Sequence, residues 1–337
     1  MDLLPNDEQT AIVDAVKEFL VGEAPVDRLR AHGEVGNPDA ALWPRLGELG
    51  FLGLGIAEAQ GGAGLSSAEE VLAFREYGRH LISPAILALT LAARVASAAG
   101  LLAAPELLAG TMRAGLANQR GPADLRAGTG VFHLIEAKGA ELIVAWDEDG
   151  AALFRRDDFT IEPVRSTDAL VSLERGTLSG AQPLAYLSAA DDAIHDRARL
   201  LIAALAAGTA EGARDMAVDY AKVREQFGKP IGSFQAVKHR CAEMAIRTEA
   251  AWSLTAFASL AFALGREDSA FMATSAKIVA TDAALKNGAS NIQVHGAIGF
   301  TSEADAHHYL KRAHLLDQLG GDLRRQRERL LDMPSAL

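Results

Sequence analysis

The sequence predicts a mainly α-helical protein in which a small β unit separates two helical blocks. Three observations support this fold class. Stretches near both ends repeat apolar residues three and four positions apart, which places them on one face of a helix. Short β-type runs punctuated by Gly, Asp and Pro fall in the middle of the chain. Proline is absent from Ile231 to Asp332, which favours long C-terminal helices.

The length and composition agree with a multi-domain globular protein. The chain has 337 residues, enough for two or three structural units. It is 49% apolar and 23% charged, as ordinary globular proteins are. We expect an N-terminal helical domain over residues 1–115, a β middle domain over 116–195 and a C-terminal four-helix bundle over 196–337.

The net charge and the first residues exclude several classes. A net charge of −11 argues against a nucleic-acid partner, although it does not exclude a small anionic ligand. The chain opens MDLLPNDEQT, which is polar and acidic where a secretory signal is basic and then apolar. The apolar segment 85–102 contains Arg94 and indicates a core helix. We therefore expect no membrane span and a cytoplasmic location.

Capping residues mark the helices of the N-terminal domain. Asn6 or Asp7 can cap the first helix. The glycine-rich run 61–64 lacks the Lys-Ser/Thr pair and the preceding strand of a phosphate-binding loop, so it predicts a tight turn. Ser66 or Ser67 then begins another helix with acidic residues in its first turn.

The middle domain is expected to consist of short strands. Gly, Asp and Pro residues supply the turns between them. The candidate strands are 131–135, 142–146, 151–154 and 169–173.

The most distinctive local feature is a polar corner between two long helices, from Tyr220 to Arg240. The first helix is expected to end at Phe227-Gly228, and Ser233 to cap the second. Gly228 and Gly232 suit backbone positions with φ > 0.

This corner presents Arg224, Lys229 and Gln235 beside a helix N-terminus. Backbone donors and the helix dipole favour an anion such as a phosphate at that place. One interpretation is a site for a phosphorylated cofactor. The other is an ordinary helical hairpin with solvated basic side chains.

The second long helix carries the seam of a bundle. Its apolar residues repeat at alternating three and four positions, and Gly265 ends it before Asp268 caps the next helix. The seam residues are Phe234, Val237, Cys241, Met244, Thr248, Ala251 and Thr255.

No metal site is expected. Cys241 is the only cysteine, and its position on an apolar helix stripe predicts a buried thiol. His307 and His308 are adjacent, so one helix cannot direct both at one metal, and we expect them at the surface. His295 either approaches a cofactor or packs within a turn.

Four stretches, in order, resemble the acyl-CoA dehydrogenase family of FAD enzymes. Arg224 to Gln235 reads R-x-x-F-G-K-x-I-G-x-F-Q. Leu42 to Ser66 is similar to the first-domain motif, with Ala57 where the family has proline. Gln293 to Glu303 is similar to the Q-x-x-G-G-x-G-F/Y stretch, with Ala297 in place of the second glycine, and His307 to Leu316 is similar to the helix that follows.

The resemblance implies an acyl-CoA dehydrogenase-like fold, an acyl-CoA substrate and FAD as cofactor. In the family, these motifs contact the pyrophosphate and adenosine end of an FAD that a neighbouring subunit mainly holds. The positions implied here are Arg224, Phe227, Gln235, Gln293, Gly296 and Ala297.

Other parts of the family's site are missing. The middle domain lacks the T-E-P-x-A-G-S-D and W-I-T-N-like motifs that contact the flavin ring, so it resembles a reduced β domain. The usual glutamate base falls on Gly320, and the position that a minority of members use falls near Ala198. Asp317 and Asp322 are weak candidates to replace the base.

This pattern is similar to the shortened, base-lacking subunit of actinobacterial α2β2 acyl-CoA dehydrogenases that act on steroid side-chain CoA thioesters. It implies a heterotetramer with a catalytic partner subunit, and electron-transfer flavoprotein or a similar acceptor. One alternative is a self-sufficient homo-oligomeric enzyme that uses Asp317 or Asp322 as base. The other is a flavin-free structural or regulatory paralogue.

Overall fold

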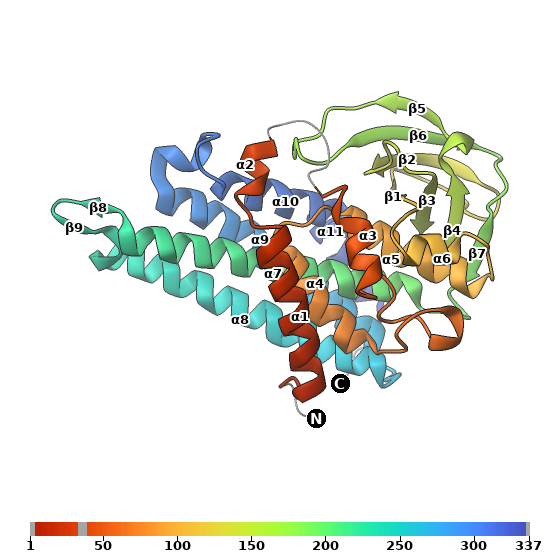
Figure 1. The fold of residues 1–337 in the computed structure, drawn as a ribbon, viewed down its shortest axis with the longest axis horizontal. Coiled ribbons are helices and arrows are strands. Elements are labelled where there is room, and N and C mark those ends of the chain that lie inside the picture. Colours follow the sequence, from red (N-terminus) through yellow and green to blue (C-terminus); the bar gives the residue numbers. More distant parts are fainter. Residues whose placement is uncertain (1–3, 33–38, 335–337) are drawn as a thin grey trace. The chain divides into compact units, whose positions relative to one another are not determined.

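The computed structural model describes residues 4–32 and 39–334. The chain forms two compact units. The first contains residues Met1–Gly33, Val71–Ile82 and Arg199–Leu337, and the second contains Glu34–Glu70 and Ser83–Ala198. Long helices dominate the first unit and a sheet the second, so the predicted fold class is confirmed (Figure 1). The predicted three-domain division stays a prediction.

The second unit is built on a seven-stranded sheet with strand order β5-β6-β2-β1-β3-β4-β7. Neighbouring strands are antiparallel except β1 and β3, which run parallel, with Leu116 opposite Val144. The strands are β1 (Ala114–Gln119), β2 (Thr129–Ile135), β3 (Leu142–Trp146), β4 (Gly150–Arg155), β5 (Thr160–Pro163), β6 (Leu173–Ser179) and β7 (Ala185–Ser188).

Helix α5 (Ala85–Ala98) packs on β1, β3, β4 and β7 of this sheet. Its sequence is apolar on nearly every side, and most of its residues are buried, as the composition predicts. The sheet contributes an aromatic cluster in which Phe159 meets Phe132 and Phe154 edge to face. The shorter helices here are α3 (Leu42–Glu48), η1 (Glu58–Gln60), α6 (Ala104–Leu108) and η2 (Arg156–Asp158).

Three predicted strands are confirmed as β2, β3 and β4, but the run 169–173 is wrong. The Asp168 carboxylate accepts the N–H of Leu170 at 3.2 Å, and the Asp168 carbonyl accepts the N–H of Val171 at 3.0 Å. These bonds close a turn, and β6 starts only at Leu173. Strands β1, β5 and β7 were not expected, because they are short or rich in small residues.

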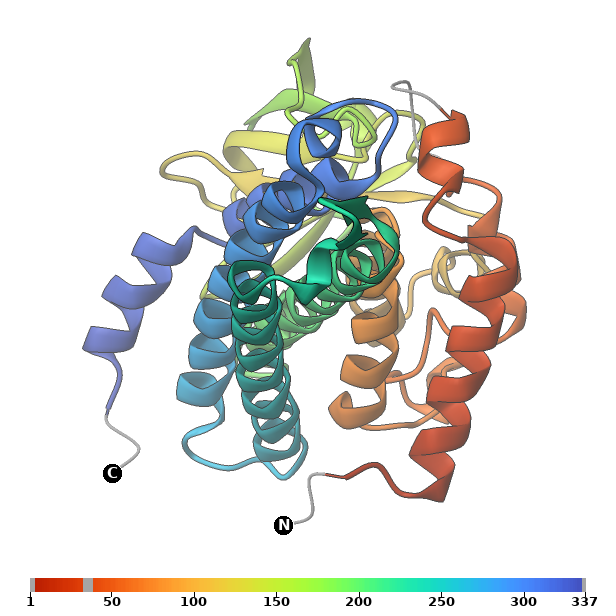
Figure 2. The same ribbon diagram turned by 90° about the vertical axis from the view of Figure 1, so that its left-hand side faces the viewer.

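The first unit is helical. Its longest helices cross-link through Asn287, whose buried amide donates to the carbonyls of Ala210 and Met244, both at 3.1 Å, and to Thr248 Oγ1 at 3.0 Å. Helices α7, α8 and α9 run side by side (Figure 2). The helices are α1 (Asp7–Glu23), α2 (Arg28–His32), α4 (Ser67–Arg79), α7 (Ile194–Val223), α8 (Gln235–Ala263), α9 (Ser269–His295), η4 (Gly296–Phe300), α10 (Ala306–Gln318) and α11 (Leu323–Asp332).

The capping predictions largely hold. Asn6 accepts the N–H of Gln9 at 2.8 Å and Gln9 accepts the N–H of Asn6 at 3.0 Å, a reciprocal capping box at α1. Ser66 Oγ accepts the N–H of Ala68 at 3.1 Å at the start of α4. Gly265, with φ of 60°, ends α8 as expected.

The seam of α8 is buried from Met244 to Thr255, as predicted. The prediction of a buried thiol at Cys241 is wrong, because Cys241 lies near the solvent-exposed start of α8 and is only half-buried.

Close packing between α4 and α7 depends on glycine. A Cβ atom on Gly208 would lie 1.9 Å from the carbonyl oxygen of Arg75, so only glycine lets α7 approach α4 there.

Candidate functional site

A two-stranded hairpin joins α7 to α8. Strand β8 (Glu225–Gln226) pairs antiparallel with β9 (Lys229–Pro230), and Phe227 and Gly228 form the tip. Both tip residues have positive φ, 54° and 75°, as a two-residue type I′ hairpin turn requires. The hairpin projects beyond the ends of α7 and α8 (Figure 1).

This corner differs from the sequence prediction in three respects. Helix α7 ends at Val223, four residues early, because the chain turns into β8. Gly232 does not have positive φ, and glycine is needed there because a Cβ atom would lie 2.8 Å from the carbonyl oxygen of Ala221. Ser233 lies in a 3₁₀ turn, and α8 starts after Phe234 without a side-chain cap.

Aromatic and basic side chains cover the outer surface of the corner. Phe227 is 91% exposed, and its ring meets Phe234 edge to face with 6.0 Å between centroids. The Lys229 ammonium lies 4.5 Å from the centroid of the Phe234 ring. Arg224 and Gln235 are exposed. The corner thus offers two accessible cations beside the N-terminus of a long helix, where an anion is stabilised.

The second predicted cofactor-binding stretch follows the end of α9, in the same unit. Gly296 has φ of 69° and ψ of −143°, a conformation that favours glycine. Ala297, which replaces the family's second glycine, does not have positive φ. Gln293, Gly296 and Ala297 are all exposed.

The rings of Tyr220 and His295 bring these two stretches together. They stack with 4.1 Å between centroids and an interplanar angle of 22°. Tyr220 precedes Arg224 by about one helical turn, and His295 lies between Gln293 and Gly296. His295 therefore packs on Tyr220 at the end of α9, beside the exposed residues, and its approach to a cofactor stays a prediction.

The turn between α10 and α11 contains Gly320, on which the resemblance predicts the family's usual base to fall, and this assignment stays a prediction. Gly320 has φ of 64°. Asp317 Oδ1 accepts the N–H of Leu323 at 2.9 Å, and Asp322 Oδ1 caps α11 by accepting the N–H of Arg325 at 2.9 Å. Both candidate carboxylates therefore have structural hydrogen bonds at the start of α11.

A buried lysine, which sequence reasoning missed, anchors this turn. Lys277 on α9 is 1% exposed, and its Nζ donates to the carbonyl oxygen of Leu319 at 2.5 Å and to that of Gly321. Gln326 Nε2 donates to the carbonyl oxygen of Gly320 at 2.7 Å. Burial lowers the pKa of Lys277 to about 7. Its place on the alanine-rich, buried stripe of α9 was the available signal.

The remaining sequence predictions concern the alternative base position, metal binding, the adjacent histidines and membrane spans. Ala198, near which the resemblance predicts the alternative base position, is buried on α7. Within residues 4–32 and 39–334, no cluster of three or more His, Cys, Asp or Glu could hold a metal ion. His307 and His308 are half-buried and stack edge to face, rather than lying fully exposed as predicted. No helix in these residues has the length and apolarity to cross a membrane.

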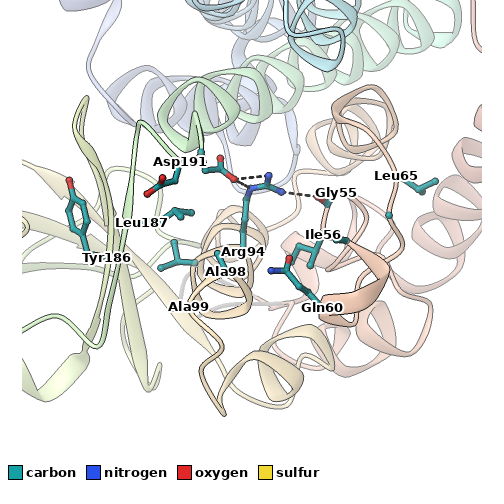
Figure 3. A pocket seen from close by; sticks show the side chains of 14 residues that line it. Gly55, Ile56, Gln60, Leu65, Arg94, Ala98, Ala99, Tyr186, Leu187 and Asp191 are labelled. Atoms are coloured by element: carbon teal, nitrogen blue, oxygen red, sulfur yellow. Dashed lines mark hydrogen bonds and ion pairs between the residues drawn. The ribbon is translucent and has the colours of Figure 1, made fainter.

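A separate cavity of about 630 Å³ lies within the second unit (Figure 3). Its central side chain is Arg94 of α5, which lies 2.7 Å from Asp192 Oδ2 and donates to the carbonyl oxygen of Gly55 at 2.8 Å. Arg94 thereby links the segment after β7 and the loop between α3 and η1 to α5. In the sequence, Arg94 is the charged residue of the apolar segment 85–102, which marks it as unusual without indicating its partners. The cavity is lined by Gly55, Ile56, Ala57, Gln60, Gly64, Leu65, Arg94, Val95, Ala98, Ala99, Tyr186, Leu187, Asp191 and Asp192.

Comparison with known proteins identifies the family. The family "Acyl-CoA dehydrogenase, N-terminal domain" matches residues 6–104, and "Acyl-CoA dehydrogenase, C-terminal domain" matches residues 190–332. The acyl-CoA dehydrogenase IpdE2 of Mycobacterium tuberculosis is 35% identical over 282 residues, which cover 83% of this chain and 82% of that protein. This chain belongs to the acyl-CoA dehydrogenase family, whose members are oxidoreductases that act on CH–CH bonds.

Its similarity extends to particular relatives. The acyl-CoA dehydrogenase FadE34 of M. tuberculosis is 36% identical over 325 residues, which cover 92% of this chain but only 45% of FadE34. This chain therefore spans about half of that relative. IpdE2 of Mycolicibacterium smegmatis is 32% identical over 332 residues, with 96% and 98% covered.

Solved structures share the fold. A variant of the Tcur3481–Tcur3483 steroid ACAD superposes with a TM-score of 0.84 at 26% identity and 97% coverage of both chains. The ChsE4–ChsE5 complex of M. tuberculosis superposes with a TM-score of 0.84 at 22% identity, covering 99% of this chain and 100% of that one. The predicted resemblance to the acyl-CoA dehydrogenase family is thus confirmed.

The corner has features that fit the nucleotide end of FAD. Arg224 and Lys229 supply positive charge for a pyrophosphate, and the helix N-terminus of α8 adds its dipole. Gly296 has open space around its Cα, since a Cβ atom at this residue would meet nothing within 4 Å. A backbone without a side chain lets a ligand approach closely.

Proposed function

We propose that this chain is a subunit of a heteromeric, FAD-dependent acyl-CoA dehydrogenase. It contributes half of an FAD site to a catalytic partner subunit and does not itself supply the base. The observation that carries this proposal is an asymmetry. The two stretches that the resemblance assigns to the nucleotide are joined by the stacked rings of Tyr220 and His295 beside exposed residues. The two positions that the resemblance assigns to the base fall on Gly320 and near Ala198, where the side chain is a hydrogen atom or a methyl group.

The residues at the corner have distinct roles in this proposal. Arg224 binds a pyrophosphate oxygen through a charge-assisted hydrogen bond. Phe227 supplies apolar surface, and the amide of Gln235 supplies a neutral hydrogen-bonding group at the start of α8. Gln293 and the bare backbone of Gly296 and Ala297 line the other side. When bound, FAD supplies the acceptor for the hydride from the β-carbon of the substrate.

The base must come from elsewhere, because neither a hydrogen atom nor a methyl group can take the α-proton of an acyl-CoA thioester. The partner subunit supplies this carboxylate in our proposal. The exposed aromatic and apolar residues of the corner, Phe227 and Val223 among them, suit contact with another chain better than contact with water.

The proposed substrate is an acyl-CoA thioester, and a steroid side-chain CoA is the specific class that we favour. The support for this is similarity, at 26% identity over nearly the whole chain, to a protein described as a steroid ACAD. Electron-transfer flavoprotein or a similar protein would then reoxidise the flavin.

Co-expression with the product of the adjacent open reading frame tests the proposal. We expect a complex of two chain types with bound flavin and dehydrogenase activity, and no activity from this chain alone. Mass measurement, flavin absorbance per complex and turnover of acyl-CoA substrates are the readouts. Turnover by the purified chain alone would contradict the proposal, and a colourless complex would favour the flavin-free alternative.

A further inference from the structure

The tautomer of His295 follows from its hydrogen bond. Nδ1 lies 2.9 Å from the backbone carbonyl oxygen of Asn291. A carbonyl oxygen can only accept a hydrogen bond, so Nδ1 carries the hydrogen. In the neutral ring, Nε2 then has a lone pair and acts as an acceptor. Burial lowers the pKa of His295, which favours this neutral form at physiological pH.

Two contacts also fix the orientation of the His295 ring. One face stacks on Tyr220, and the bond to Asn291 prevents rotation about the ring axis. Asn291 is itself fully buried, and its amide lies 3.5 Å from the sulfur of Met216. Two constraints from two helices, α7 and α9, therefore fix where Nε2 lies.

The surroundings of this ring are open. His295 is only half-buried, and Gln293 and Gly296 beside it are exposed. Apart from the neighbouring residues His295 and Ala297, no part of the chain lies within 4 Å of the position that a Cβ atom on Gly296 would take. A preorganised acceptor thus stands at the edge of the surface to which the proposed function assigns the nucleotide.

We propose that Nε2 of His295 accepts a hydrogen bond from a donor group of the bound nucleoside, either the amino group of adenine or a ribose hydroxyl. This role rests on the proposed function and adds a specificity determinant to it. A phosphate cannot take this place, because its oxygens are acceptors and would face another acceptor. The phosphates belong instead near Arg224 and Lys229.

The test uses the co-expressed complex after its flavin has been removed. FAD is added back and its dissociation constant is measured by flavin fluorescence. His295→Leu keeps apolar contact with Tyr220 but removes the acceptor, and we expect about three- to tenfold weaker FAD binding, the range for one neutral hydrogen bond. His295→Gln retains an acceptor oxygen and should lose less. His314→Leu, at an exposed site on α10, is the matched control and should bind FAD normally.

Competition identifies the donor group. ADP, IDP, which lacks the adenine amino group, and 2′-deoxy-ADP compete with FAD for the apo-complex. A preference for ADP over IDP that His295→Leu abolishes assigns the amino group. A preference for ADP over 2′-deoxy-ADP that the same variant abolishes assigns the 2′-hydroxyl.

These measurements distinguish a failure of the proposed role of His295 from a failure of the proposed function. If Arg224→Ala weakens FAD binding while His295→Leu binds FAD and all three competitors as the wild type does, the role of His295 is overturned and the proposed function stands. If the wild-type complex binds no FAD, or if neither Arg224→Ala nor His295→Leu weakens FAD binding, the proposed function and the role of His295 both fall. Thermal unfolding of each variant excludes a folding defect as the cause.

Discussion

The Lys277 side chain donates a hydrogen bond to the carbonyl oxygen of Leu319 at 2.5 Å, in a place where the lysine is 1% exposed. This contact links α9 to the turn that leads into α11. With Gln326, Lys277 accounts for the carbonyl groups of three consecutive residues, Leu319 to Gly321. These hydrogen bonds hold the backbone of the turn between α10 and α11.

Lys277 should make stability depend on pH. Burial lowers its pKa from 10.5 to about 7. Between these values the unfolded chain binds a proton that the folded chain does not, so the free energy of unfolding should rise with pH across this window. The expected slope is up to roughly 1 kcal/mol per pH unit.

Denaturant unfolding at pH 7, 8 and 9 measures this effect. Lys277→Met should be less stable by about 1–3 kcal/mol through the lost hydrogen bonds at alkaline pH, and should lack the rise. Lys286→Met, on the same helix but 58% exposed, should keep the wild-type profile. An unchanged pH profile in Lys277→Met would contradict the assignment.

Arg224→Ala should weaken flavin retention by the complex. Loss of a charge-assisted hydrogen bond to a phosphate costs roughly 1.5–3 kcal/mol, which corresponds to about a 10- to 150-fold weaker affinity. Absorbance in the flavin band after gel filtration is the measurement. Arg327→Ala, exposed on α11, is the charge-matched control. Equal flavin content in both variants would contradict the assignment of Arg224 to the pyrophosphate, whereas a complex without flavin would support the flavin-free alternative.

Asp322 offers a way to separate chemistry from stability. Asparagine caps a helix about as well as aspartate does, so Asp322→Asn should leave the thermal midpoint nearly unchanged, whereas Asp322→Ala should cost about 1 kcal/mol. If the partner subunit supplies the base, the turnover of the complex is the same in Asp322→Asn and the wild type. Abolished turnover in Asp322→Asn or Asp317→Asn would instead support the self-sufficient enzyme.

The ion pair between Arg94 and Asp192 should stabilise the second unit. Both side chains are largely buried, with 19% and 15% exposure, so loss of one partner leaves a poorly solvated charge. We expect Arg94→Met to lower the free energy of unfolding by roughly 1–3 kcal/mol. A double-mutant cycle with Asp192→Asn should give a coupling energy above about 0.5 kcal/mol. Strict additivity would show that the pair contributes nothing.

Much of the local structure was predictable, because it depends on neighbours in sequence. The cap at Asn6, the end of α8 at Gly265 and the buried apolar helix α5 each follow from residues within a few positions. The errors share a cause. The run 169–173 has β-type residues, but the hydrogen bonds of Asp168 turn the chain, and a seven-residue strand begins where the run ends.

The candidate site also combines features that the sequence predicts with features that depend on tertiary contacts. Its residues, such as Arg224 and Gln293, were predictable from motifs in single stretches of chain. The contact between the two stretches was not predictable, because it is a ring contact between Tyr220 and His295 on two helices distant in sequence. The roles of Lys277 and Arg94 were not predictable either, since a charged residue in an apolar stretch does not reveal its partner.

By itself, the sequence determined the fold class and the family, because these depend on residue identity and short-range pattern. Only the tertiary structure decided which backbone groups surround Lys277, which ring orients His295 and how the hairpin presents Phe227. Hydrogen bonds and ring contacts act over a few ångströms. Because the residues that make these contacts are distant in sequence, only the folded structure shows which of them meet.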